Sequence, residues 1–216
     1  MLEINNEQAT QALLFKGGIT NNCKLESVEF NPAYVTRDDL KLPEDQQVKK
    51  AALTFHFSTN RANPTDHRIL NWATYEPKEH NQKFFEIFRD RFKHMYEVFT
   101  KKVFPPMKNI AGYPELFKIV ADTFNGNVYA EDGTVTSTPV YRDANGTPLA
   151  INIKAVYDKT GKIGFGFGNI IELYDAKNPT KTNLEKKMSD NFEIPEKPKG
   201  LLLEDGDDSP KEALPF

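Results

Sequence analysis

The 216-residue sequence predicts a mainly β domain with a helical insertion, which is an α+β fold. Three runs of alternating apolar residues precede one strongly periodic helix, and two more such runs follow it. The expected architecture is a five-stranded barrel with helices between the third and fourth strands. The chain has no run of eighteen apolar residues and no basic N-terminal region before an apolar core. We therefore expect neither a membrane span nor a secretory signal.

The segment from Gln82 to Phe104 has the clearest period in the chain. Its large apolar residues recur every three or four positions, which places them on one face of a helix. These residues are Phe84, Phe85, Phe88, Phe92, Met95, Tyr96, Phe99 and Val103. Pro105 and Pro106 end the helix because proline has no N–H to donate. A shorter helix is expected over Pro114–Phe124, so the helical insertion covers 81–124.

Three strands are expected before the long helix. They cover Ile19–Phe30, Val48–Ser58 and Arg68–Tyr75. In the first strand the apolar positions change from odd to even numbers, which predicts a β-bulge near Ser27. In the second strand Phe55 and Phe57 belong to the core, and His56 points to the opposite face.

Two further strands are expected after the helices. The fourth covers Leu149–Tyr157, with Lys154 on the reverse of its apolar face, and the fifth covers Ile163–Tyr174. Glycine occupies alternate positions of the fifth strand, which indicates a tight barrel bend or the close approach of another backbone. An extra β-hairpin around Asp132 and Gly133 is expected within 125–148.

Strand, strand, strand, helix, strand, strand is the order of the OB-fold, a five-stranded Greek-key barrel that commonly binds oligonucleotides. The OB-fold domain is expected over 19–175, with the helical insertion at 81–124 and the hairpin at 125–148. An N-terminal helical segment over 1–18 precedes it, with its helix from Asn6 to Lys16. A disordered, acidic tail over 176–216 follows it, because this part is rich in proline and charge and poor in aromatic residues.

The last part of the tail has a net negative charge, whereas the rest of the chain has a small positive excess. The chain has 31 acidic and 28 basic residues, and residues 188–216 contain eight of the acidic residues but only three lysines. The chain ends in Leu214-Pro215-Phe216, which follows the acidic residues Asp207 and Asp208. This end resembles the acidic C-terminal tip of bacterial single-stranded DNA-binding proteins, and the large insertions favour a phage-type member of that family. The resemblance implies that replication or recombination proteins bind this tip through Asp207, Asp208, Leu214, Pro215 and Phe216.

Binding of a single strand requires cationic groups for the phosphates and exposed aromatic faces for the bases. In an OB-fold these groups lie on the second and third strands and in the loops after the first and fourth. The candidates are Lys49, Lys50, His56, Arg61, Arg68, Trp72, Tyr75, Lys154, Lys159 and Lys162. Trp72 and Tyr75 differ in strand parity, so only one of them can face the DNA.

The sequence shows no catalytic motif such as a Walker A loop, a G-x-S-x-G elbow or an H-E-x-x-H helix. The four histidines have no ligand spacing, and the single Cys23 excludes an internal disulfide and a cysteine zinc site. We therefore expect no enzymatic activity, no cofactor and no metal. The default location is the cytoplasm, which is that of the bacterial host if a phage encodes the protein.

The expected function is that of a single-stranded DNA-binding protein. It would coat unwound DNA in replication, recombination and repair, recruit partners through its tip, and could assemble as a homo-oligomer. The sequence leaves open a virion or scaffold protein that uses the β-barrel for protein contacts. A nuclease is a third reading, but it requires clustered carboxylates that the sequence does not display.

Overall fold

The computed structural model describes residues 13–36, 39–59, 67–77, 81–107, 110–126, 138–159, 161–165, 168–188 and 190–194. Most of the predicted N-terminal helix, Arg61, the tip of the predicted hairpin and the C-terminal tip lie outside these residues. Leu13 and Leu14, which the sequence placed near the end of that helix, form a short strand instead.

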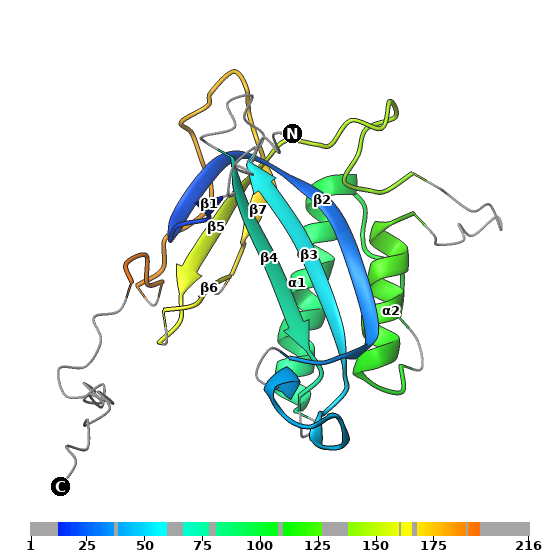
Figure 1. The fold of residues 1–216 in the computed structure, drawn as a ribbon. Helices are drawn as coiled ribbons and strands as arrows, with labels where there is room; N and C mark the ends of the chain where they lie inside the picture. Colours follow the sequence, from blue (N-terminus) through cyan, green and yellow to red (C-terminus); the bar gives the residue numbers. More distant parts are fainter. Residues whose placement is uncertain are drawn as a thin grey trace, which may run out of the picture.

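One sheet forms the centre of the fold (Figure 1). Its strands are β1 (Leu13–Leu14), β2 (Gly18–Tyr34), β3 (Lys50–Thr59), β4 (Arg68–Tyr75), β5 (Ile151–Tyr157), β6 (Ile163–Gly164) and β7 (Ile171–Leu173). The order across the sheet is β1-β4-β3-β2-β5-β6, and β7 also pairs with β5. All these pairs are antiparallel except β1 with β4.

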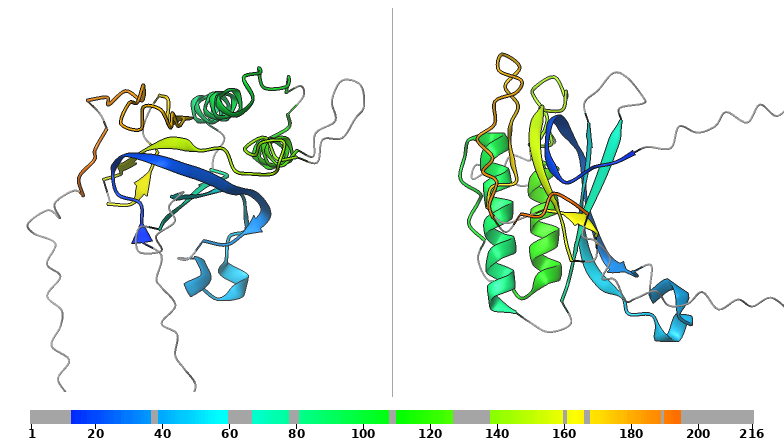
Figure 2. Two further views of the ribbon diagram at one scale, coloured as in Figure 1. Left: turned by 90° about the horizontal axis from the view of Figure 1, so that it is seen from above. Right: turned by 90° about the vertical axis from the view of Figure 1, so that its left-hand side faces the viewer.

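Two α-helices and two short 3-10 helices complete the α+β fold. The α-helices are α1 (Gln82–Thr100) and α2 (Tyr113–Phe124), and the 3-10 helices are η1 (Asp39–Lys41) and η2 (Glu44–Gln46). Figures 1 and 2 show α1 and α2 side by side on one face of the sheet, whereas η1 and η2 project on the other side. The helical insertion between the third and fourth long strands is therefore confirmed. Among the described helices, none combines the length and the apolar character that a membrane span requires.

The apolar stripe of α1 forms the core together with β3 and β4. Phe92 is fully buried and lies against Phe55 of β3, with ring centroids 5.8 Å apart. Trp72 of β4 is only 8% exposed and contacts both rings. Trp72 is thus a core residue, and the prediction that it is a DNA contact is wrong. Burial of Trp72 and partial exposure of Tyr75 agree with their difference in parity.

The long helix ends earlier than the sequence predicted. Asn81 begins it as a cap, because its side chain accepts a hydrogen bond from the Phe84 backbone N–H. At the other end Lys101 adopts the left-handed conformation, with φ of 60°, and stops the helix after Thr100. Val103 consequently lies beyond the helix and is 80% exposed, so it is not part of the apolar stripe.

Strand β2 contains two irregularities in its pairing with β3, and the second determines how far the strand reaches. The first is a register shift against β3 between Leu25 and Ser27, which confirms the predicted bulge. The second lies between Asn31 and Tyr34, around Pro32, where proline is tolerated because a bulge frees its position from the ladder. The strand therefore continues past its predicted end at Phe30 and brings Tyr34 onto the sheet.

The predicted last strand is not continuous. Residues 163–173 form two short strands, β6 and β7, because the chain leaves the extended conformation between them, with φ of +78° at Gly168. No described pairing joins β4 to β6 or β7, so the sheet is open on this side. Phe165 lies in the break and packs against Trp72, with centroids 4.8 Å apart. In a closed barrel, pairing of β4 with the last strand would cover the core at this point. Here the contact between Phe165 and Trp72 covers it instead.

The chain after β7 returns to the sheet and packs on β5. We call residues 183–192 the strap, of which all but residue 189 are described. Lys154 of β5 is fully buried, and its Nζ donates to the Asp190 Oδ2 at 2.8 Å and to the Glu185 carbonyl at 2.9 Å. The Tyr157 N–H donates to the Asn191 carbonyl at 2.7 Å. Lys154 is therefore not a DNA contact, and the ordered domain extends beyond the predicted tail boundary at 176.

Candidate nucleic-acid interface

The sheet presents polar side chains on the face opposite α1 and α2. Strand alternation explains this, because Phe55 and Phe57 point into the core and Thr54 and His56 therefore point away from it. The antiparallel register extends the pattern across three strands. It places Thr54 between Glu29 of β2 and Ala73 of β4, and His56 between Ser27 and Asn71.

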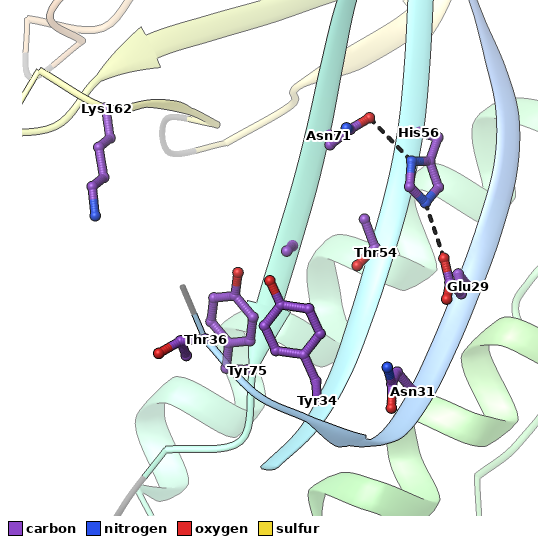
Figure 3. A pocket seen from close by; sticks show the side chains of 10 residues that line it. Glu29, Asn31, Tyr34, Thr36, Thr54, His56, Asn71, Tyr75 and Lys162 are labelled. Carbon is purple, nitrogen blue, oxygen red and sulfur yellow. Dashed lines mark hydrogen bonds and ion pairs between the residues drawn. The ribbon is translucent and has the colours of Figure 1, made fainter. Parts of the chain in front are cut away.

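A hollow of about 540 Å³ lies on this outer face (Figure 3). Strands β2, β3 and β4, the chain after β2 and the turn before β6 all contribute to it. Its lining residues are Glu29, Asn31, Tyr34, Thr36, Thr54, His56, Asn71, Ala73, Tyr75 and Lys162. Thr54 and Ala73 lie at the bottom of the hollow, and their short side chains do not fill it. The volume is within the range of sites that hold small organic ligands.

A row of three polar side chains forms one wall of the hollow. The Nδ1 of His56 is 3.0 Å from the Oδ1 of Asn71, and its Nε2 is 3.4 Å from a carboxylate oxygen of Glu29 (Figure 3). The row fixes the imidazole ring between β2 and β4. The Asn71 amide N–H groups and the second Glu29 oxygen have no other partner among the described residues. They are one set of donors and one acceptor that face the hollow.

Two stacked tyrosines form the opposite wall. The rings of Tyr34 and Tyr75 lie 5.2 Å apart between centroids, at an interplanar angle of 29°. Figure 3 shows both rings beside each other at the end of the hollow, with their hydroxyl groups toward its interior. Both side chains are partly exposed, so the pair offers aromatic surface to a ligand. Such a surface is what an unpaired base stacks on.

The structure brings together three of the ten predicted DNA-binding residues. His56, Tyr75 and Lys162 line the hollow. Four others are on the described surface but outside its lining: Lys49, Lys50, Arg68 and Lys159. Lys50 pairs with Tyr34 in the register of β2 and β3. Lys159 lies between the end of β5 and the start of β6. Trp72 and Lys154 are buried, and Arg61 is outside the described residues.

Sequence reasoning missed seven residues that line the hollow. They are Glu29, Asn31, Tyr34, Thr36, Thr54, Asn71 and Ala73. The signal for Thr54 and Asn71 was present, because both share the parity of a predicted neighbour on the same strand. Tyr34 gave no such signal, since its place depends on the second irregularity of β2.

The hollow contains few formal charges. Glu29 is negative and 63% exposed at its side chain, and Lys162 is positive. The described residues include no group of three or more His, Cys, Asp or Glu side chains arranged to hold a metal ion. The chemistry of the hollow is therefore that of stacking and hydrogen bonding, with one cation at its edge.

Comparison of the chain with protein-family models, with curated proteins and with solved structures finds no match in any of the three. The functional argument therefore depends on the geometry of the site.

Proposed function

We propose that the protein binds single-stranded DNA across the outer face of β2, β3 and β4. The observation that carries the proposal is the hollow itself, in which a stacked tyrosine pair faces a polar row across a low floor. Unpaired bases need an aromatic platform and hydrogen-bonding groups for their edges. The bases of a duplex are already stacked and paired, so they cannot use the tyrosines in this way.

The position of the hollow supports the same function. In OB-folds the ligand surface consists of the middle strands and the loops after the first and fourth strands. Here Tyr34 and Thr36 come from the chain after the first long strand, and Lys162 comes from the turn after the fourth. We propose an OB-type domain whose last strand is divided into β6 and β7. The ligand surface would then be the outer face of β2, β3 and β4, which α1 and α2 do not cover.

The charge distribution fits a protein that holds a polyanion reversibly. Outside residues 188–216 the chain contains 25 basic and 23 acidic residues, so the body has a small positive excess. The acidic end competes for the same cationic groups. We propose that it leaves the DNA face when a strand binds and that its tip, Leu214-Pro215-Phe216, then recruits a replication or recombination protein.

A titration with a fluorescent oligonucleotide tests the binding proposal. We expect the protein to bind a single strand more tightly than the duplex of the same length, with little dependence on base sequence. The logarithm of the binding constant should fall linearly with the logarithm of the salt concentration, by about 0.7 for each phosphate contacted. Equal or tighter binding to duplex would contradict the proposal. No binding at low salt would also contradict it, and would favour a virion or scaffold protein.

Deleting Asp205 to Phe216 tests the role of the tail. The deletion removes four acidic residues and one lysine. We expect the affinity for single strands to stay the same or to rise a few-fold at low salt, because a competing polyanion is gone. Capture of replication or recombination proteins on immobilised protein should be lost.

The variant Phe216→Ala is the matched control for this deletion, because it keeps every acidic side chain. It should lose partner capture and retain the affinity of the full chain for DNA. If the deletion weakens DNA binding, the acidic end contributes to the DNA site and the competition that we propose does not exist.

A further inference from the structure

The imidazole ring of His56 has an acceptor oxygen beside each of its two nitrogens. The Nδ1 lies 3.0 Å from the Asn71 Oδ1, and the Nε2 lies 3.4 Å from a carboxylate oxygen of Glu29 (Figure 3). Amide and carboxylate oxygens accept hydrogen bonds and cannot donate them, so each contact is favourable only when the nitrogen carries a hydrogen. A neutral imidazole has one N–H and an imidazolium has two. The geometry of the row is therefore that of the charged ring.

Few other charged groups of the described chain lie near this ring. On β2, Lys24 and Glu26 pair with each other at 3.1 Å. The outward residues of β3 and β4 beside the ring are uncharged. The other titratable groups of the hollow are the tyrosine pair on the opposite wall and Lys162 from the turn before β6. Glu29 is therefore the carboxylate whose charge the ring balances.

The hydrogen on Nδ1 also fixes the Asn71 side chain. While Nδ1 carries a hydrogen, the Asn71 Oδ1 accepts it and the amide N–H groups face the hollow. A neutral ring that keeps its hydrogen on Nε2 for Glu29 has a lone pair on Nδ1, and the amide must then turn an N–H group toward it. The Asn71 carbonyl would then face the hollow. Loss of one proton thus removes a positive charge from the row and turns an acceptor toward the ligand.

The charge of the row acts on any phosphate that approaches the hollow. The Glu29 side chain is 63% exposed and the His56 side chain is 30% exposed, so a bound ligand experiences both charges. When the ring is charged the two charges cancel, whereas with a neutral ring the carboxylate repels phosphates. Histidine is the residue whose charge changes between about pH 5 and about pH 8. The net charge of the row therefore changes within this range.

We propose that the row of Glu29, His56 and Asn71 makes the hollow a pH-sensitive site, which binds single-stranded DNA more tightly when His56 is charged. The inference rests on the proposed function and adds the regulation of the same site. Protonation of His56 neutralises the row and keeps the Asn71 donors toward the ligand. Deprotonation leaves the Glu29 carboxylate uncompensated, and the strand is held less tightly.

The variant His56→Gln tests this inference in the full chain. Dissociation constants of a single-stranded oligonucleotide of about 10 nucleotides are measured by fluorescence anisotropy at about pH 5 and about pH 8, at constant ionic strength. We expect the wild type to bind about fivefold more weakly at the higher pH, which is the effect of one unit charge close to a phosphate in water. His56→Gln should bind at both pH values as weakly as the wild type does at the higher one.

Two further variants separate the row from the rest of the protein. The matched control is His94→Gln, which removes a histidine from α1 on the opposite face of the sheet and should keep the fivefold pH dependence. Glu29→Gln removes the carboxylate and keeps the ring. At about pH 8 it should bind the oligonucleotide about fivefold more tightly than the wild type, because the uncompensated negative charge is gone.

Three results would overturn the inference although the protein binds DNA. In the first, the wild type has the same affinity at both pH values. In the second, His56→Gln retains the pH dependence of the wild type, so another group is responsible. In the third, Glu29→Gln binds like the wild type at about pH 8, so the carboxylate does not repel the strand. Failure of the wild type to bind the oligonucleotide at either pH would instead remove the proposed function.

Discussion

Replacing Tyr75 by alanine is expected to weaken the binding of a single-stranded oligonucleotide about tenfold. Alanine substitution of an aromatic residue that stacks on a base costs roughly 1–3 kcal/mol, and 1.36 kcal/mol corresponds to a factor of ten. Tyr75 is on the outward side of β4 and is only partly buried. The loss should therefore appear in the dissociation constant, while the free energy of unfolding changes little.

Tyr34 and Tyr75 should not act independently. Their rings stack on each other at 5.2 Å, so removal of either ring also removes the support of the other. We expect the double alanine variant to lose less binding free energy than the sum of the two single losses, with a coupling of roughly 0.5–3 kcal/mol. A double-mutant cycle measured by fluorescence titration gives this value directly.

Phenylalanine at the same positions provides the matched control. Tyr75→Phe and Tyr34→Phe keep the aromatic faces and remove only the hydroxyl groups, so both should bind close to wild type. Wild-type affinity in both alanine variants would show that the tyrosine pair is not the base platform.

Asp190→Ala is expected to lower the free energy of unfolding by about 3–5 kcal/mol, because it leaves the buried Lys154 ammonium without its counter-charge. The pair is among the most buried of the described ionic contacts, with side-chain exposures of 1% for Lys154 and 0% for Asp190. The Glu185 carbonyl would remain as a hydrogen-bond partner of the ammonium, but it carries no compensating charge. Urea unfolding of the variant and the wild type measures the difference.

A second variant separates loss of charge from loss of packing. Replacing both residues, as Lys154→Met with Asp190→Leu, removes the charges together and should recover most of the stability. The exposed pair Lys118 and Asp122 of α2 is the control, since its atoms are 2.6 Å apart but its side chains are in water. Asp122→Ala should change the free energy of unfolding by less than about 1 kcal/mol. An equally small change in Asp190→Ala would show that the strap contributes little to the fold.

Local periodicity was enough to predict the elements that depend on neighbouring residues. The apolar stripe of α1, the alternation of β3 and the bulge near Ser27 are all confirmed. Each follows from which side chains a short segment must bury. The difference between Trp72 and Tyr75 followed from the same rule, although the rule could not say which of them was in the core.

The errors in the prediction concern contacts between distant segments. Lys154 is on the reverse face of β5, as its parity indicated, but alternation does not reveal that the strap covers this face. The break in the last strand likewise depends on Phe165 finding space beside Trp72. Tyr34 joined the site only because β2 continues past Pro32. No local pattern contains these facts, because each requires knowledge of what packs against the segment.

Photo-crosslinking of a bound single strand is the most direct test of the account. An oligonucleotide with photoreactive bases is irradiated in complex with the full chain, and the modified residues are identified by mass spectrometry. We predict adducts on the outer face of β2, β3 and β4, with Tyr34, Tyr75 and His56 among the modified residues. Adducts confined to α1 and α2, on the opposite face of the sheet, would contradict the proposed interface.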